Sequence, residues 1–193
     1  QSDMEGPFLQ FLLARLAKWQ PDLVVPIGSP AGRFVVKYRD RLFPGTPVIY
    51  TGMDRRTLPH DAFQSNATFV GESFDLAGLR VHCVPQMLTV PAALEALEEA
   101  DANRSADRSN LLITHPRLTQ LRPRYDDINE IEIDVSTLKS DFVLLGHYHV
   151  HQKVDAGVWY AGSPDTFTFA DDPDRPKGFV VLDTDTGAMQ HLP

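Results

Sequence analysis

The sequence predicts an α/β protein, and two observations lead to that class. Short apolar runs bounded by glycine, proline or histidine are typical of buried strands, and they alternate with segments whose apolar residues recur at helical spacing. Alternating strands and helices are typical of a parallel sheet with helices on its faces, so we expect that architecture. The 193 residues suit one domain or two small domains that are fused.

The N-terminal part follows the order helix, strand, helix, strand over residues 7–52. Pro26 is unusual for a central strand, and Pro44 with Gly45 ends the second helix. The four predicted elements are a helix over residues 6–20, a strand over 22–28, a helix over 31–43 and a strand over 46–52.

The C-terminal part predicts two hairpins and, between them, strands that end at histidines. Its elements are a hairpin over residues 68–85 that turns at 76–78, a helix over 90–100, a strand over 110–116, a short helix over 136–140, a strand over 142–146, two strands joined at 155–157 and a final hairpin that turns at Thr186 and Gly187.

Charge and cysteine content weigh against some classes of function and exclude an intrachain disulfide. With 18 Lys and Arg against 26 Asp and Glu, the formal net charge is −8, which counts against non-specific nucleic-acid binding. A local basic patch at Arg117, Arg122 and Arg124 stays open. Cys83 is the single cysteine, so no intrachain disulfide forms, and we expect it to be a small buried hydrophobic residue. No apolar run is long enough to cross a bilayer and no signal peptide opens the chain, so we expect a cytoplasmic protein.

Two of the predicted strands end in histidines. His115 follows the apolar run of residues 111–114, and His147 and His149 follow the run of residues 142–145. Ligands of open α/β sheets bind outside the carboxyl ends of the strands, where these imidazoles are expected to converge. Imidazole is a common ligand of Zn, Mn and Fe. The sequence therefore predicts a metal site with His115, His147 and His149 as ligands.

The spacing of His147 and His149 has a physical explanation. Residues two apart in a strand point to the same face, and Gly146 is expected to let the backbone turn close to the site. The two imidazoles then reach one ion, or one ion each of a close pair. Two-metal sites hold their ions about 3.5–4 Å apart. We expect His151, past the turn, to lie at the surface.

At these residues the sequence resembles a known family. "LLGHYHVHQ" with the upstream "LLITHPRL" is similar to the calcineurin-like metallophosphoesterases, and "WYAGSPDTFTFADDPDRPKGFVVLD" resembles their branch of DNA double-strand-break repair exonucleases. The resemblance covers residues 72–185. It implies an α/β/β/α sandwich, incomplete in the N-terminal part, and hydrolysis of phosphate esters, DNA among them, by hydroxide activated by two divalent ions (Mn, Fe or Zn).

The resemblance also implies roles for single residues. His115 and His147 correspond to ligands of one ion and His149 to a ligand of the other, and His115 and His149 take part in catalysis. Asp3 corresponds to the first aspartate of the family. Gly162 and Ser163 shape the turn behind the site. A large coiled-coil ATPase is the partner that the family implies, and no membrane is involved.

The N-terminal part departs from the family pattern. Glu5 stands where the family has histidine, Ser29 where it has the bridging aspartate and Met53 where it has asparagine, and Arg55 follows Asp54. A serine does not replace the charge of the carboxylate that holds both ions. Without that carboxylate, three neutral imidazoles hold a pair of metal ions poorly.

A second resemblance concerns the N-terminal part. Residues 21–79 are similar to a lobe of the periplasmic-binding-protein-like sensor modules of bacterial signalling kinases, in which residues 28–30 and 51–52 are loops at the ligand rim. Two organisations stay open: one phosphoesterase-like domain over residues 1–193, or a join near residues 76–80 between a parallel β-α-β part and a phosphoesterase part. The alternative function is a catalytically inactive ligand-binding or sensor module with a vestigial histidine site.

Overall fold

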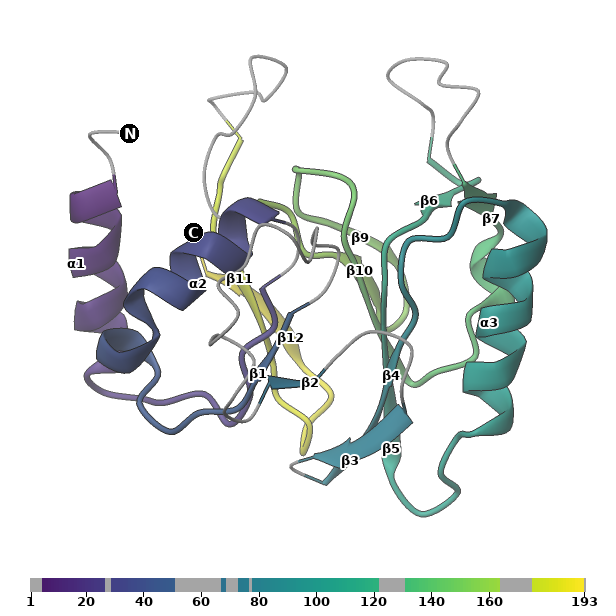
Figure 1. Ribbon diagram of the computed structural model, residues 1–193, viewed down its shortest axis with the longest axis horizontal. Coiled ribbons are helices and arrows are strands. Elements are labelled where there is room, and N and C mark those ends of the chain that lie inside the picture. The colour runs from purple at the N-terminus through teal and green to yellow at the C-terminus, as the bar shows by residue number, and fades with distance from the viewer. Residues whose placement is uncertain are drawn as a thin grey trace. The chain divides into compact units, whose positions relative to one another are not determined.

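The computed structural model, drawn in Figure 1, describes residues 5–26, 29–50, 67–68, 73–76, 78–121, 131–163 and 175–192. The chain forms two compact units, residues 1–68 and residues 69–193. The α/β class is confirmed, since helices and a mixed sheet are both present. A join of unlike halves near residues 76–80 stays a prediction.

The first unit contains two packed helices and a short parallel strand pair. Helix α1 (Glu5–Leu16) and helix α2 (Ser29–Leu42) contact each other through Phe8 and Phe34, whose ring centroids lie 5.1 Å apart. Strand β1 (Val48–Ile49) pairs in parallel with β2 (Ala67–Thr68). The two predicted helices and a strand within residues 46–52 are therefore confirmed.

The strand predicted over residues 22–28 is wrong for the part of it that the structure describes, residues 22–26. There, Val24 alone makes a bridge, to Val48. Its N–H donates to the carbonyl of Pro47 (3.0 Å), and its carbonyl accepts from the N–H of Ile49 (2.9 Å). Pro26 has no N–H with which to continue a ladder, so the pairing stops after one bridge.

The second unit is built on a six-stranded mixed sheet. Its strands, in spatial order, are β3 (Ser73–Leu76), β4 (Leu79–Cys83), β5 (Ser109–Thr114), β8 (Phe142–Leu145), β10 (Val158–Tyr160) and β9 (Gln152–Asp155). The four central strands are parallel, and β3 and β9 are antiparallel edges made by hairpins. The hairpins and strands that the sequence predicts here are confirmed.

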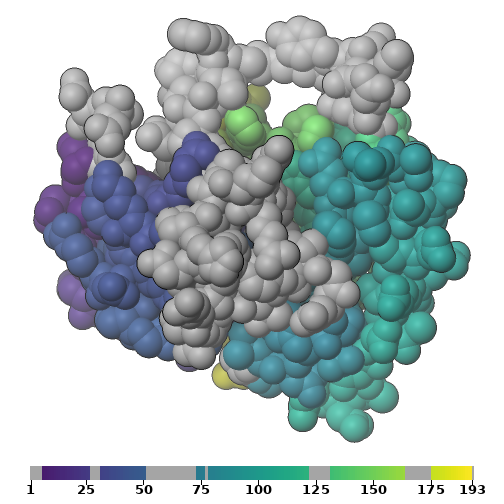
Figure 2. Space-filling view, in the orientation of Figure 1, coloured from purple at the N-terminus to yellow at the C-terminus, as the bar shows by residue number. Residues whose placement is uncertain are grey.

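Helix α3 (Val90–Ala102) covers one face of this sheet. Thr89 caps its N-terminus: the hydroxyl accepts the N–H of Ala92 (3.3 Å), a cap worth about 1 kcal/mol. Its inner side packs Leu97 against apolar side chains of β5, β8 and β10, and each buried aliphatic side chain contributes about 1.5–3 kcal/mol. The outer side carries glutamates and forms part of the teal surface in Figure 2.

A hairpin of β11 (Phe179–Leu182) and β12 (Met189–Leu192) lies over the opposite face. Val143 faces α3, so its neighbour Phe142 points to the other face of the sheet. There it lies beside the hairpin turn, since a Cβ added at Gly187 would lie 3.7 Å from the Phe142 ring. On the same face, the ring of His191 in β12 stacks on His151, which stacks on Trp159 in β10. The second unit therefore has three layers: α3, the sheet and the β11–β12 hairpin.

Two short strands and a helical turn complete the described part of the second unit. Strand β6 (Arg117–Leu118) pairs in parallel with β7 (Glu132–Ile133), and the 3-10 helix η3 (Val135–Thr137) follows. Asp134 caps η3 by accepting the N–H of Ser136 (2.8 Å). No helix within the described ranges is long and apolar enough to cross a membrane.

Cys83 is buried in β4, as the sequence predicts. Burial disfavours the charged thiolate and raises the pKa of the Cys83 thiol to about 12. A thiol with such a pKa is a poor nucleophile, so Cys83 is a packing residue.

Replacing Gly157 by alanine is expected to destabilise the second unit more than replacing Gly78. Both residues have positive φ, 72° and 80°, which costs an L side chain about 1–2 kcal/mol. A Cβ at Gly157 would also overlap the carbonyl oxygen of Asp141, whereas nothing lies within 4 Å at Gly78. In urea denaturation we expect Gly78→Ala to cost about 1–2 kcal/mol and Gly157→Ala about 3 kcal/mol or more. Equal losses would contradict the close approach to Asp141.

Candidate functional site

The site is formed where the neighbouring parallel strands β5 and β8 end. Thr114 pairs with Leu145 at their last residues, and the N–H of Gly146 donates to the carbonyl of Thr114 (3.0 Å), which extends the ladder by one step. His115 and His147 then leave the sheet next to each other. Their ring centroids lie 5.7 Å apart in an edge-to-face arrangement. The structure brings these two imidazoles together, as expected from the strand ends.

The backbone turn at the site falls on His147 and not on Gly146. His147 has φ 91°, and it is the one residue other than glycine with a positive φ in the part of the chain that the structure describes. Gly146 does not have a positive φ, so the left-handed backbone conformation falls on the residue after the glycine. A side chain held there costs about 1–3 kcal/mol, and such conformations cluster at functional sites. The close approach expected at Gly146 stays a prediction.

His149 is held by its backbone carbonyl. This oxygen accepts hydrogen bonds from the N–H of Ser163 (3.1 Å), the hydroxyl of Ser163 (3.2 Å) and the ammonium of Lys177 (3.2 Å). Gly162 has φ 78°, and a Cβ there would lie 2.7 Å from the backbone nitrogen of His151. Gly162 and Ser163 thus lie against the histidine segment. Lys177 was not predicted, although it lies in the "PKG" stretch of the resemblance.

His115 is the most strongly perturbed histidine of the described residues. Its pKa is lowered to about 4, first by burial and then by the nearby charges of His147 and His149. Its Nδ1 atom is buried and has no hydrogen-bond partner. Buried polar atoms are normally satisfied, and one that is not needs an explanation such as a bound ion or water.

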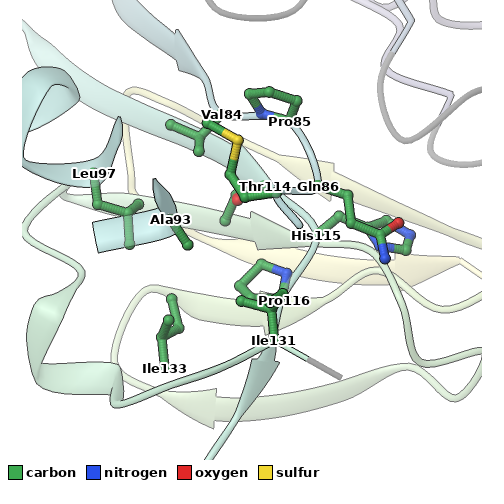
Figure 3. A pocket seen from close by; sticks show the side chains of 11 residues that line it. Val84, Pro85, Gln86, Ala93, Leu97, Thr114, His115, Pro116, Ile131 and Ile133 are labelled. Atoms are coloured by element: carbon green, nitrogen blue, oxygen red, sulfur yellow. The ribbon is translucent and has the colours of Figure 1, made fainter. Parts of the chain in front are cut away.

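The burial of His115 comes from an apolar surround. The residue lies at the edge of a small cavity of about 10 Å³, walled by side chains that include Val84, Leu97 and Ile133 (Figure 3). This volume holds about one water molecule. The cavity is too small for a substrate, and its mainly apolar lining disfavours the charged form of the imidazole.

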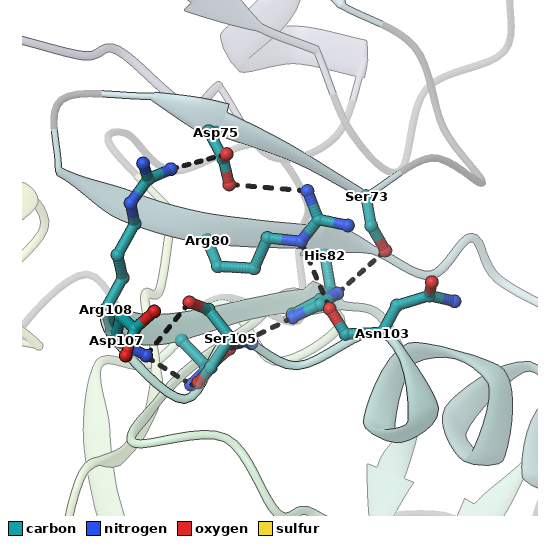
Figure 4. A network of polar contacts seen from close by, with 9 residues as sticks. Ser73, Asp75, Arg80, His82, Asn103, Ser105, Asp107 and Arg108 are labelled. Atoms are coloured by element: carbon teal, nitrogen blue, oxygen red, sulfur yellow. Dashed lines mark hydrogen bonds and ion pairs between the residues drawn. The ribbon is translucent and has the colours of Figure 1, made fainter.

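His82 shows what a structural histidine looks like in the same sheet. It is 1% exposed and its pKa is lowered by burial, as for His115. Its Nδ1, however, lies 2.8 Å from the hydroxyl of Ser73, and its Nε2 lies 3.5 Å from Oδ1 of Asn110 (Figure 4). Both ring nitrogens therefore have partners. The unpartnered Nδ1 distinguishes His115 from this core residue.

His151 is not the surface residue that the sequence predicts. It is half-buried, and its ring stacks on His191 and on Trp159, with centroid distances of 4.2 Å and 5.2 Å. Its Nδ1 lies 3.1 Å from the carbonyl of Tyr160. His151 therefore joins β12 to the edge of the sheet. The sequence alone does not show this contact, because it does not show where β12 packs.

The expected basic patch is also changed. Arg117 is 7% exposed and forms an ion pair with Glu132, so it does not offer an exposed charge. Arg122 and Arg124 lie outside the described residues.

The donor set fits part of a metal site. His115 and His147 supply two neighbouring imidazoles, and Nδ1 of His115 is buried without a hydrogen-bond partner. Within the described ranges, no group of three or more His, Cys, Asp or Glu residues is placed to hold an ion. Asp3 and Asp54 lie outside those ranges, and Ser29 begins α2. The described residues thus bring two imidazoles together and complete neither a one-ion nor a two-ion centre.

The strain at His147 predicts an unusual order of stability. We expect His147→Gly to be more stable than His147→Ala by about 1–2 kcal/mol, because both lose the imidazole but only alanine keeps a Cβ at φ 91°. Urea denaturation measures the difference. The exposed helix residue Glu95 is the control, where glycine is expected to be less stable than alanine by about 1 kcal/mol. Equal stability of the two His147 variants would contradict the strained conformation.

The lowered pKa of His115 predicts a pH dependence in metal-free protein. Between about pH 6.5 and about pH 4 the unfolded chain binds a proton at His115 that the folded chain does not, so stability falls as pH falls through this window. At pH 5 this difference costs about 2 kcal/mol relative to neutral pH. His82, His151 and His191 act in the same direction, so the measurement compares wild type with His115→Gln in urea at both pH values. An equal pH dependence of the two proteins would refute the shift.

Comparison with protein-family models and with curated proteins finds no match for this chain, so its family stays a prediction from the motifs.

Proposed function

We propose that the second unit is a metallophosphoesterase-type domain that binds a divalent metal ion through His115 and His147 and hydrolyses phosphate esters. The observation that carries the proposal is the proximity of these imidazoles after the ends of β5 and β8, with 5.7 Å between ring centroids. A second support is the buried Nδ1 of His115 without a partner.

The layer order of the second unit supports the same proposal. Helix α3, the six-stranded sheet and the β11–β12 hairpin give the order α/β/β. The proposed fold is the α/β/β/α sandwich of the phosphoesterases, incomplete or degenerate in its N-terminal part. This order agrees with three of the four layers.

The chain's own residues have separable tasks in this proposal. His115 stays neutral because its surround is apolar, which keeps a nitrogen lone pair ready for an ion at neutral pH. The strained backbone of His147 aims the second imidazole, and the three hydrogen bonds to the carbonyl of His149 fix the segment that follows. A bound divalent ion would lower the pKa of the water molecule that it coordinates and would polarise a phosphoryl oxygen.

The substrate and partner follow from the resemblance alone. The proposed substrate class is phosphate esters, with DNA phosphodiesters as the extended case and an ATPase as the proposed partner. A formal net charge of −8 disfavours the binding of long polyanions without sequence preference. A small activated phosphodiester is therefore the first substrate to test.

Metal binding and hydrolysis test the proposal. We expect the full chain to bind Mn²⁺ or Zn²⁺ in calorimetry and to hydrolyse bis(p-nitrophenyl) phosphate. His115→Ala and His147→Ala are each expected to weaken binding by at least about 10-fold, since loss of an outer partner alone costs about 10–100-fold. His191→Phe is the control, because it keeps a ring against His151 outside the metal-binding pair.

A second function is favoured by the division of the chain after residue 68. Of residues 20–80, which the resemblance assigns to a small-molecule sensor lobe, those up to residue 68 lie in the first unit and would contribute part of that lobe. The histidine site would then bind an ion without catalysis. Metal binding without hydrolysis supports this inactive module. Absence of both metal binding and hydrolysis, with the histidines intact, overturns the proposed metallophosphoesterase.

A further inference from the structure

We propose that Tyr160 is the positioning residue of the histidine site and fixes both imidazoles from one buried side chain. This inference rests on the proposed function only for the identity of the bound ion. Tyr160 ends β10 and is 0% exposed, and it pairs with Leu145, the last residue of β8. Its side chain lies on the α3 face of the sheet, next to the ends of both strands that carry the histidines.

The hydroxyl of Tyr160 fixes the segment that carries His115. It donates a hydrogen bond to the carbonyl of Pro116 (3.0 Å) and accepts one from the N–H of Leu118 (2.9 Å). These two backbone groups lie just after His115, where the chain turns from β5 into β6. Buried backbone groups need partners, so one hydroxyl satisfies a donor and an acceptor of this turn at once.

The ring of Tyr160 fixes His147 through Tyr148. The centroids of Tyr160 and Tyr148 lie 4.9 Å apart at an interplanar angle of 83°, and those of Tyr148 and His147 lie 4.9 Å apart at 79°. Edge-to-face contacts are the favoured geometry of aromatic pairs. They hold His147 in a backbone conformation that is unfavourable by itself.

The contacts form a closed circuit. From the Tyr160 hydroxyl it runs through Pro116 to His115, across to His147, through Tyr148 and back to the Tyr160 ring. The sequence separations within it are large, 44 residues between Pro116 and Tyr160. Each imidazole is thus positioned relative to the other by the same side chain. A residue that only filled the core would contact one of the two segments through packing and would not bond to the turn.

The variant Tyr160→Phe separates positioning from packing, because it keeps the ring and removes the hydroxyl. In the metal-free 193-residue chain we expect the imidazole nitrogen and carbon NMR shifts of His115 to move, with those of His147 changed less. We expect the dissociation constant for Zn²⁺ to rise about 10-fold or more, as for other outer partners of metal ligands. Unfolding in urea is measured in parallel.

Two controls match this variant. Tyr50→Phe removes the hydroxyl of another buried tyrosine, in the first unit, and is expected to leave the His115 shifts and Zn²⁺ affinity unchanged. Val158→Ala lowers stability from the same strand without touching the circuit. If Val158→Ala weakens Zn²⁺ binding as much as Tyr160→Phe does, the effect is due to lost stability. That result would overturn the positioning role of Tyr160.

A second variant keeps the proposal testable if Tyr160→Phe does not fold. Tyr148→Leu removes only the ring link, and the shifts of His147 are then expected to move more than those of His115. Unchanged imidazole shifts in the variants that fold refute the inference. Wild-type protein that binds no Zn²⁺ overturns the proposed function instead, while the metal-free NMR still decides whether Tyr160 positions the imidazoles.

Discussion

The candidate site depends on the parallel pairing of β5 with β8. Their last residues, Thr114 and Leu145, are direct partners, so the two histidine segments leave the sheet at one level. The register is fixed by the side chains under α3, because a shift by one residue would turn Leu112 and Val143 away from the helix. The packing of the α3 face therefore decides whether His115 and His147 meet. The same face holds Tyr160, which ties the two segments together after they leave the sheet.

Histidines occupy three different environments in the second unit. His82 is a satisfied core residue, His151 and His191 stack between the hairpin and the sheet edge, and His115 is buried with an unsatisfied nitrogen. Burial lowers the pKa of all four, so the shift alone does not separate function from structure. Hydrogen-bond partners separate His82, whose two ring nitrogens are both satisfied, from His115, whose buried Nδ1 has no partner. His191 also has a buried nitrogen without a partner, Nε2, and what separates it from His115 is its position, stacked on His151 rather than next to His147.

Local patterns predicted most elements of the second unit and several of the first. Helix α3, the hairpins and the strands that end at histidines follow from periodicity and turn residues, which act over a few neighbouring positions. The strand predicted over residues 22–28 was wrong for residues 22–26, because Pro26 lacks the N–H that the next step of the ladder needs. Gly146 was expected to let the backbone turn, but the positive φ falls on His147, whose ring packs edge-to-face against Tyr148. The exposed position expected for His151 failed because β12, forty residues later, covers it.

The sequence by itself determined the α/β class, the strand ends that carry His115 and His147, and the buried state of Cys83, because each is written in a short window of residues. Only the tertiary structure decided that the two imidazoles meet, that His115 has an unpartnered nitrogen, and that Tyr160, Ser163 and Lys177 hold the surrounding segments. These contacts join residues that are 14 to 44 positions apart. Pairing over such distances depends on strand register and on the packing of α3 and the β11–β12 hairpin, which no single window of the sequence specifies.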